Sequence, residues 1–221
     1  MQIIVIVLGI AHLTTLSSAA SDVKGTYWST QSDAGGCQLP TGSYQVLDAL
    51  ALGQGSALGA LKYRPGLCGQ VLDVSCGGSS VSAVVVSTCN LGSDSCGVDL
   101  IEKTWNKATG NKSPGIVSCT VEMSSKNPLA GGERCFHRTG SAQDGYSRIL
   151  GVLNTGGKIV TSAKLAGKVG SQSNGAWFEF NAGGQNLFTD SAEVEFTYEG
   201  GGKATFSLSD CDGPSSVQIF K

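Results

Sequence analysis

Residues 67–89 read LCGQVLDVSCGGSSVSAVVVSTC and contain the clearest structural signal in the chain. From 71 to 76 the side chains alternate, with Leu72 and Val74 on one face and Asp73 and Ser75 on the other, as in a half-buried strand. The run of valines from 84 to 86 is typical of a strand buried on both faces. Gly77-Gly78 between the two segments predicts a β-hairpin.

The segments around this hairpin predict a small barrel. Residues 25–30 (GTYWST) and 116–123 (IVSCTVEM) are expected to form strands. Residues 98–109 (VDLIEKTWNKAT) are expected to form a helix, because Leu100, Ile101 and Trp105 share one apolar face. Such a set of strands with one helix is enough to close a small barrel.

A second β-rich domain is predicted after residues 124–133 (SSKNPLAGGE), which form a polar stretch with one proline and a glycine pair. Short strands at even spacing, with glycine-rich turns between them, indicate a β-sandwich of immunoglobulin-like size. The expected strands are 146–154, 158–167, 176–181, 192–199, 203–210 and 217–220. We therefore expect a barrel over 21–124 and a sandwich over 134–221.

The first twenty residues predict a secretory signal peptide. They are mostly apolar and end in Ser18, Ala19 and Ala20, a small-residue pattern suited to cleavage after Ala20. A buried N-terminal strand is the alternative. No later segment approaches the ~20 apolar residues of a membrane span. We expect the mature chain outside the cell, with no membrane partner.

The cysteine count favours disulfides over metal binding. Six of the eight cysteines precede residue 120, and an even number in an exported chain indicates disulfide pairs. Cys135 and Cys211 would together close most of the second domain. The first six cysteines allow fifteen connectivities. There is no C-x-x-C, and His137 alone follows the leader, so we expect neither a metal site nor a cofactor.

The charge pattern favours a neutral partner. The formal net charge is −2, and acidic and basic residues are scattered along the chain. No basic stripe is available to bind nucleic acid or anionic lipid. We expect a monomer that binds a neutral polymer.

Several motifs, in this order and spacing, resemble the expansins and expansin-like proteins. In the first half these are GTYWS, GGC, CGQVLDVSC, VSAVVVSTC, CGVDL and PGIVSCTVEM. In the second half they are YSRILGVLNTGGKIVTSAKL and NGAWFEFN, and the resemblance covers residues 24–212. It implies a six-stranded double-psi β-barrel, as in barwin and family 45 endoglucanases, followed by a β-sandwich that binds carbohydrate.

The resemblance also implies a function and a site. Expansins loosen cellulose and matrix glucans in the cell wall without hydrolysis. The family's key acid matches Asp99, at the start of the expected helix, and its first-strand pair matches Thr26 and Tyr27. Aromatic rings that stack on sugars match Tyr146 and Trp177. Asp99 has a simpler reading as a first-turn acid favoured by the helix dipole.

Hydrolysis needs a second carboxylate, and the sequence offers a poor one. Where the family often has an acid, this chain has Ser87, which cannot activate water. Asp94 could take that role if the loop between Cys89 and Cys96 folds inward. One acid without a base favours polymer slippage over cleavage. The alternatives are a barwin-type defence or glycan-binding protein that loosens nothing, and a family-45-like endoglucanase that uses Asp94.

Overall fold

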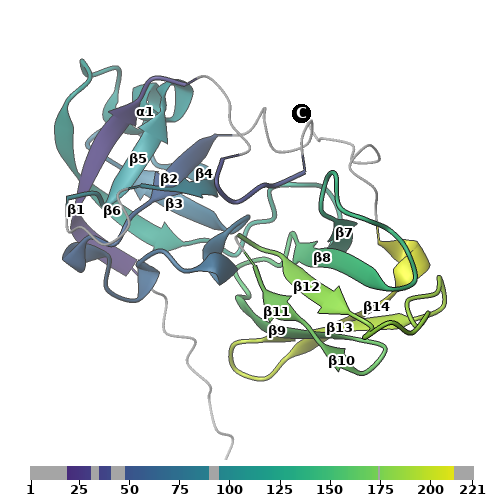
Figure 1. Ribbon diagram of the computed structural model, residues 1–221. Coiled ribbons are helices and arrows are strands. Elements are labelled where there is room, and N and C mark those ends of the chain that lie inside the picture. Colours follow the sequence, from purple (N-terminus) through teal and green to yellow (C-terminus); the bar gives the residue numbers. More distant parts are fainter. Residues whose placement is uncertain (1–18, 31–34, 41–47, 90–94, 174, 212–221) are drawn as a thin grey trace, which may run out of the picture.

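A computed structural model describes residues 19–30, 35–40, 48–89, 95–173 and 175–211. The chain forms a barrel followed by a unit built from two sheets, and the two lie side by side (Figure 1). The barrel strands lie between residues 19 and 123, and the strands of the second unit lie between residues 134 and 207. The fold is therefore mainly β, as the sequence predicts.

The barrel is closed by six strands. Around the barrel they run β1 (Ala19–Trp28), β5 (Val98–Ile101), β2 (Ala49–Leu52), β4 (Val81–Thr88), β3 (Val71–Ser75) and β6 (Ile116–Met123). The predicted hairpin is confirmed, because β3 and β4 pair antiparallel. Two pairs are parallel, β1 with β5 and β2 with β4. The parallel pairs bring together segments that are distant in sequence.

The helix is shorter than the sequence predicts. Helix α1 spans Glu102–Thr109, and Val98–Ile101 is strand β5 instead of the first helical turn. Leu100 pairs in register with Tyr27 of β1 and Leu50 of β2. The segment therefore forms a strand that closes the barrel, and the helix begins only after it. Asp99 therefore lies in the middle of a strand, and its expected position at a helix start is wrong. Trp105 of α1 is fully buried.

Two short 3₁₀ helices, η1 (Ser56–Leu61) and η2 (Pro65–Leu67), precede β3 in the barrel half of the chain.

The second unit consists of two four-stranded sheets. One sheet runs β10 (Lys168–Val169), β9 (Val160–Leu165), β13 (Glu193–Tyr198) and β14 (Lys203–Ser207). The other runs β11 (Ser171–Gln172), β12 (Phe178–Asn181), β8 (Ser147–Leu153) and β7 (Arg134–His137). A last 3₁₀ turn, η3, spans Leu208–Asp210.

The two sheets of the second unit share one apolar core. Phe178 and Phe180 from β12 pack in the same cluster as Val194 and Phe196 from β13. Phe178 and Phe196 meet edge to face, with ring centroids 6.2 Å apart. Five of the six strands predicted in this half are present, and the sixth, at 217–220, lies outside the described residues.

Four disulfides staple the chain. Cys135 and Cys211 pair as predicted, with a sequence separation of 76 residues. The other pairs, which the sequence leaves open, are Cys37–Cys68, Cys76–Cys119 and Cys89–Cys96. The first of these fixes the stretch before β2 against the segment before β3.

The barrel and the second unit are joined by a buried contact centred on Trp177. The Trp177 indole N–H donates to the backbone oxygens of Cys37 at 3.0 Å and Gln38 at 3.1 Å. Phe136 and Trp177 belong to the same core cluster as the barrel side chains. The barrel core thus extends to these two residues, whereas the sandwiched sheets of the second unit have a separate apolar cluster of their own.

Polar side chains fix the same junction. Gln70 Nε2 donates to Thr155 Oγ1 at 2.9 Å, and both residues are buried. Arg64 and Glu199 form a two-pronged ion pair at the surface, with the shorter N–O distance 2.8 Å. These contacts resist independent movement of the two units.

Most of the predicted leader, residues 1–18, lies outside the described residues. Ala19 and Ala20 begin β1 and pair with Glu122 and Val121 of β6. A register shift separates them from Val23, where regular pairing resumes. In the described part of the chain, no helix has the length and apolar character needed to cross a membrane.

Candidate functional site

A row of side chains crosses the outside of the barrel. Register places Thr26 beside Asp99, Asp99 beside Ala51, and Ala51 beside Ser87, on strands β1, β5, β2 and β4. Ile116 of β6 lies opposite Thr26 and extends the row. Side chains of residues in register share a face of the sheet. Because strands lie about 4.8 Å apart, the row spans roughly 19 Å.

Strand alternation keeps this row outside the barrel. On either side of Asp99, Val98 and Leu100 are fully buried in the barrel core. Asp99 therefore points the other way, and it is only half-buried. The row opens into a pocket of about 370 Å³. Its lining residues are Thr26, Trp28, Ala51, Ser87, Thr88, Cys89, Ser95, Cys96 and Asp99.

Thr26 and Asp99 form the polar centre of the pocket. The Thr26 hydroxyl donates to Asp99 Oδ1 at 2.7 Å, which brings together two residues that the sequence marks separately as site candidates. Burial raises the pKa of Asp99 above its ordinary value, and the hydrogen bond from Thr26 opposes that rise. The carboxyl is thus easier to protonate than an exposed aspartate.

Asp99 is the one carboxylate among the described residues that line the pocket. The proposed partner Asp94 lies outside the described residues. Ser87 Oγ accepts the backbone N–H of Gly36 at 3.0 Å, so this serine anchors a loop at the end of the row. The described part of the pocket offers an acid and hydrogen-bonding groups, with no second carboxylate.

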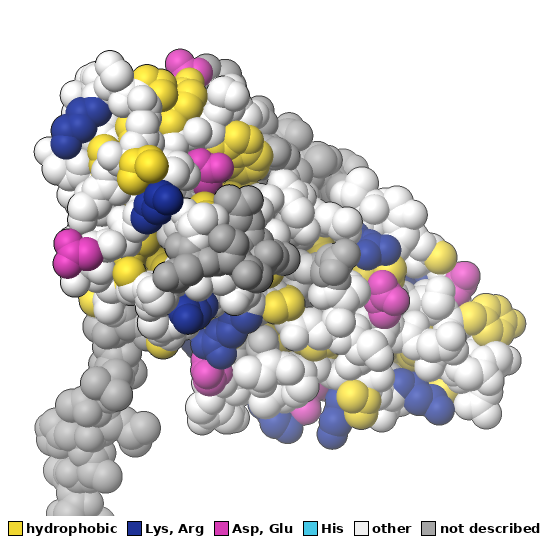
Figure 2. Space-filling model, turned by 60° about the vertical axis from the view of Figure 1, so that its left-hand side comes forward, with side chains coloured by type: hydrophobic (Ala, Val, Ile, Leu, Met, Phe, Trp, Pro, Cys, Tyr) yellow, Lys and Arg dark blue, Asp and Glu magenta, His cyan; other side chains and the backbone are white. Residues whose placement is uncertain are grey.

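The surface charge is mixed. In the described part of the chain, no group of His, Cys, Asp and Glu side chains could hold a metal ion. Figure 2 shows Lys and Arg side chains interspersed with Asp and Glu on the face in view. The pocket itself holds one acidic side chain and no Lys or Arg among its described lining residues. Neither feature suits a strongly charged ligand.

Two solved structures are similar to the chain over most of its length. An expansin mutant from Clavibacter michiganensis in complex with cellohexaose matches at 17% identity with a TM-score of 0.64, covering 91% of this chain and 96% of that one. The apo Clavibacter michiganensis expansin matches at 18% identity with a TM-score of 0.62, with the same coverage of both chains. No protein-family model and no curated protein matches the sequence. The chain has the fold of an expansin.

On this expansin fold, the aromatic residue of β1 that lines the pocket is Trp28, and the predicted Tyr27 is not among the lining residues. Tyr27 faces the helix and packs edge to face on Trp105, with ring centroids 5.9 Å apart and planes at 83°. Tyr27 therefore lies outside the described lining of the pocket, and its role in the site stays a prediction. Trp28, two residues beyond Thr26, shares its face and lines the pocket. Alternate residues of a strand share a face, so the position of Trp28 two residues after Thr26 is the sequence signal that could have identified it.

Trp177 does not act as an exposed ring on this expansin fold. Its side chain is 0% exposed, and its indole N–H is fully used in the contact with Cys37 and Gln38. A ring enclosed on both faces cannot stack on a sugar, so the predicted binding role of Trp177 is wrong. Phe178, the neighbouring ring, is also buried, in the core of the second unit.

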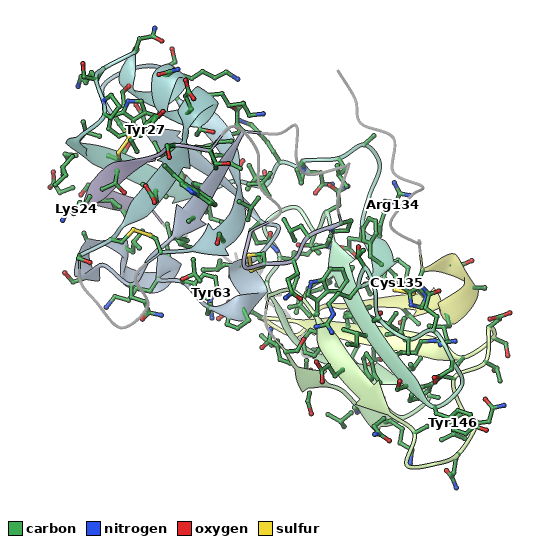
Figure 3. The ribbon with its side chains drawn as sticks, turned by 45° about the horizontal axis from the view of Figure 1, so that its top comes forward. Lys24, Tyr27, Tyr63, Arg134, Cys135 and Tyr146 are labelled. Carbon is green, nitrogen blue, oxygen red and sulfur yellow. A yellow bond between two sulfur atoms is a disulfide. The ribbon has the colours of Figure 1, made fainter. Side chains whose placement is uncertain are left out.

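Tyr146 is exposed but distant from the barrel pocket. Its side chain is 51% exposed, immediately before β8. The Asp144 carboxylate accepts the backbone N–H groups of Tyr146 and Ser147, each at 2.8 Å, which fixes the turn. Figure 3 places Tyr146 at the end of the second unit remote from the barrel, whereas Tyr27 lies on the barrel. The predicted pair of sugar-stacking rings therefore leaves one candidate, far from Asp99.

Proposed function

We propose that the protein binds a neutral, extended cell-wall glucan such as cellulose in the Asp99 pocket and loosens it without hydrolysis. The observation that carries this proposal is the Thr26–Asp99 hydrogen bond beside Trp28, in an open pocket of an expansin fold. One of the structurally similar proteins, the Clavibacter michiganensis expansin mutant, was solved in complex with cellohexaose. That ligand is a short piece of the proposed substrate.

The pocket supplies two complementary contacts for a sugar chain. Asp99 and Thr26 exchange hydrogen bonds with hydroxyl groups, and Trp28 offers an indole face to the apolar face of a pyranose ring. Net hydrogen bonds contribute about 0.5–1.5 kcal/mol each, and more with a charged partner. Contacts of this size exchange reversibly with those between neighbouring glucan chains. A segment can therefore leave its neighbour and return.

The charge of the pocket selects a neutral polymer. Asp99 is the charged side chain among the described lining residues, and no Lys or Arg there offsets it. A polyuronate would place its carboxylates against the Asp99 carboxylate in a half-buried position. Repulsion in that setting disfavours acidic wall polymers and leaves neutral β-linked glucans.

Asp99, as the one carboxylate among the described lining residues, favours loosening over cleavage. Glycosidases place two carboxyl groups about 5–5.5 Å apart for retention or about 6.5–9.5 Å apart for inversion. The side chains that flank Asp99 in the row are Thr26 and Ala51, and neither can act as a base. Binding without an activated water leaves the glycosidic bond intact.

The rest of the chain supports a secreted, two-domain protein. Four disulfides are typical of proteins outside the cell, where they persist. In this proposal residues 1–20 are removed on export, 21–124 form the barrel domain, and 134–221 form an immunoglobulin-like sandwich. Tyr146 would add one weak sugar contact at the far end of that sandwich. The protein would act as a monomer in the cell wall.

The test compares wild-type protein with Asp99→Asn on filter paper and on amorphous cellulose. We expect wild type to weaken the paper and release no reducing sugar. We expect Asp99→Asn to stay bound to cellulose but weaken nothing. Equal weakening by the variant would refute the role of Asp99.

An endoglucanase is the second candidate, because the raised pKa of Asp99 is also what a general acid requires. Release of reducing sugar by wild type, lost in Asp99→Asn, would establish this alternative. Cellulose binding with neither weakening nor sugar release would instead identify a barwin-type binding protein.

A further inference from the structure

A buried arginine lies in the second unit, away from the barrel pocket. Arg148 belongs to β8 and is 7% exposed. It is in register with Phe180 of β12 and two residues before Leu150, and both of these side chains lie in the core. Alternate residues of a strand share a face, so Arg148 also points inward. Figure 3 places Tyr146, two residues earlier, at the end of the second unit remote from the barrel.

The guanidinium of Arg148 uses only part of its donor capacity. Its Nη2 donates to the backbone oxygen of Phe188 at 3.3 Å. Nε and Nη1 are buried, and no described residue accepts a hydrogen bond from either of them. A guanidinium carries five N–H donors, and a buried donor without a partner destabilises the fold. Arg148 therefore calls for an acceptor that the described residues do not supply.

His137 adds a second polar group at the same place. It pairs in register with Leu150, so it faces the same core, and it is a diagonal neighbour of Arg148 on the adjacent strand β7. It is 6% exposed, and its buried Nδ1 has no hydrogen-bond partner among the described residues. Burial and then the charge of Arg148 lower the pKa of His137. The imidazole is therefore neutral at pH 7 and can offer one ring N–H.

The charge of Arg148 is not balanced by a carboxylate in contact with it. Burial lowers the pKa of Arg148, and the charges of Asp144 and Asp190 oppose that fall. Both aspartates are exposed, and the Asp144 carboxylate already accepts the backbone N–H of Tyr146. A buried charge needs both hydrogen bonds and an opposite charge. A water molecule can accept the hydrogen bonds but cannot supply the charge.

We propose that Arg148 and His137 bind a small monovalent inorganic anion, with the size and charge of chloride, inside this end of the second unit. The proposal does not depend on the proposed function. The anion accepts hydrogen bonds from Arg148 and from the His137 ring, and it balances the guanidinium. The cost of taking an ion out of water rises steeply with its charge, which disfavours sulfate and phosphate at a buried site. The exposed Asp144 and Asp190 nearby disfavour a divalent anion further.

The bound anion fixes the end of the second unit that contains Tyr146. It joins β7 and β8 beneath the segment whose Phe188 oxygen accepts from Arg148. The backbone N–H groups of Leu187 and Phe188 both donate to the Gly145 oxygen, so this segment also holds the turn before Tyr146. Binding of the anion should therefore stabilise the folded chain.

The first experiment measures thermal melts in sodium chloride and in sodium gluconate at equal ionic strength. Gluconate is too large to enter a buried site of this kind, so it serves as the reference anion. The proteins are wild type, Arg148→Met and Lys168→Met. Methionine keeps much of the arginine stem without its charge. Lys168 is exposed on β10, so its replacement is the control for the loss of one positive charge.

We expect the Tm of wild type to be about 3 °C higher in chloride than in gluconate when chloride is at about ten times its Kd. Lys168→Met should show the same difference, and Arg148→Met should show none. Equal Tm values of wild type in the two salts would overturn the proposal. A chloride effect that persists in Arg148→Met would also overturn it.

A second measurement uses wild type alone and covers the case in which Arg148→Met does not fold. Crystals grown in sodium bromide should show an anomalous peak within hydrogen-bond distance of Arg148 and His137. Ordered water at that place, with no anomalous peak, would refute the site. A bromide peak without any chloride effect on the Tm of wild type would identify an adventitious ion only, and the proposal would fall.

Discussion

The Thr26 hydroxyl donates a 2.7 Å hydrogen bond to the Asp99 carboxylate across two parallel strands, between residues 73 positions apart in sequence. Only closure of the barrel brings them together, because β5 lies between β1 and β2. The pair thus links the fold directly to the chemistry of the pocket. It also leaves a carboxylate half-buried at some cost to stability.

Asp99→Asn should stabilise the protein at neutral pH. Burial raises the folded-state pKa of Asp99 above its unfolded value. Between those two pKa values the folded state binds more protons than the unfolded state, so stability falls as pH rises through that window. Asparagine does not ionise and escapes this loss. Thermal melts should show a higher Tm for the variant at pH 7, with the difference shrinking toward pH 3.

Asp73→Asn provides a control of opposite sign. Burial by itself raises the pKa of Asp73, but hydrogen bonds from Ser82, Lys126 and Ser124 and the Lys126 charge bring it below the ordinary value. Its contribution to stability is present at neutral pH and is lost as pH falls. This variant should therefore melt lower than wild type at pH 7. A Tm for Asp99→Asn below wild type at pH 7 would contradict the first prediction.

Thr26→Val should raise the pKa of Asp99 further. The threonine hydroxyl stabilises the charged carboxylate, and valine keeps the shape but not the hydrogen bond. An NMR titration of the Asp99 side-chain carboxyl carbon should show its midpoint at higher pH in the variant. A midpoint that stays in place would mean that the hydrogen bond is absent in solution.

Sequence patterns predict the strands of this protein better than its site. The hairpin of β3 and β4 follows from alternation and a glycine pair, which are local signals. Residues Val98–Ile101 fit a helix locally, because Leu100, Ile101 and Trp105 share a helical face. These residues form a strand because they pair with the distant strands β1 and β2, and such pairing cannot be predicted from a local pattern.

Burial of aromatic rings is the other point that sequence leaves undecided. Trp177 and Trp28 both lie in strand-like segments, and a strand pattern says only that alternate residues share a face. Contact with Cys37, 140 positions away, encloses Trp177. The resemblance to expansins marks Thr26 and Asp99 as site candidates, but their hydrogen bond depends on the parallel pairing of β1 with β5, which no local pattern predicts.

Trp177 should be a stability residue. Trp177→Phe removes the indole N–H and leaves the Cys37 and Gln38 oxygens without that donor, at a cost of about 1–3 kcal/mol. Trp177→Ala should cost about 3–5 kcal/mol, as for other large buried rings. Urea unfolding measures both, with the exposed Tyr146→Ala as the control. Unchanged stability together with lost cellulose binding would restore Trp177 as a binding ring.

The Cys135–Cys211 disulfide should add more to the free energy of unfolding than the Cys89–Cys96 disulfide does. Its sequence separation is 76, against 7 for Cys89–Cys96. Chain-entropy arguments give about 4.5 kcal/mol for the long loop and about 2.5 kcal/mol for the short one. Paired Cys→Ser variants, compared by urea unfolding, should rank in this order. A larger loss from the short loop would contradict it.

The most direct test of glucan binding at the barrel pocket uses tryptophan fluorescence. The chain has three tryptophans, and Trp105 and Trp177 are fully buried, whereas Trp28 lines the pocket. Titration with cellohexaose should change the emission of wild type and of Tyr146→Ala, and should leave that of Trp28→Phe unchanged. An emission change that persists in Trp28→Phe would place the sugar elsewhere and contradict the account.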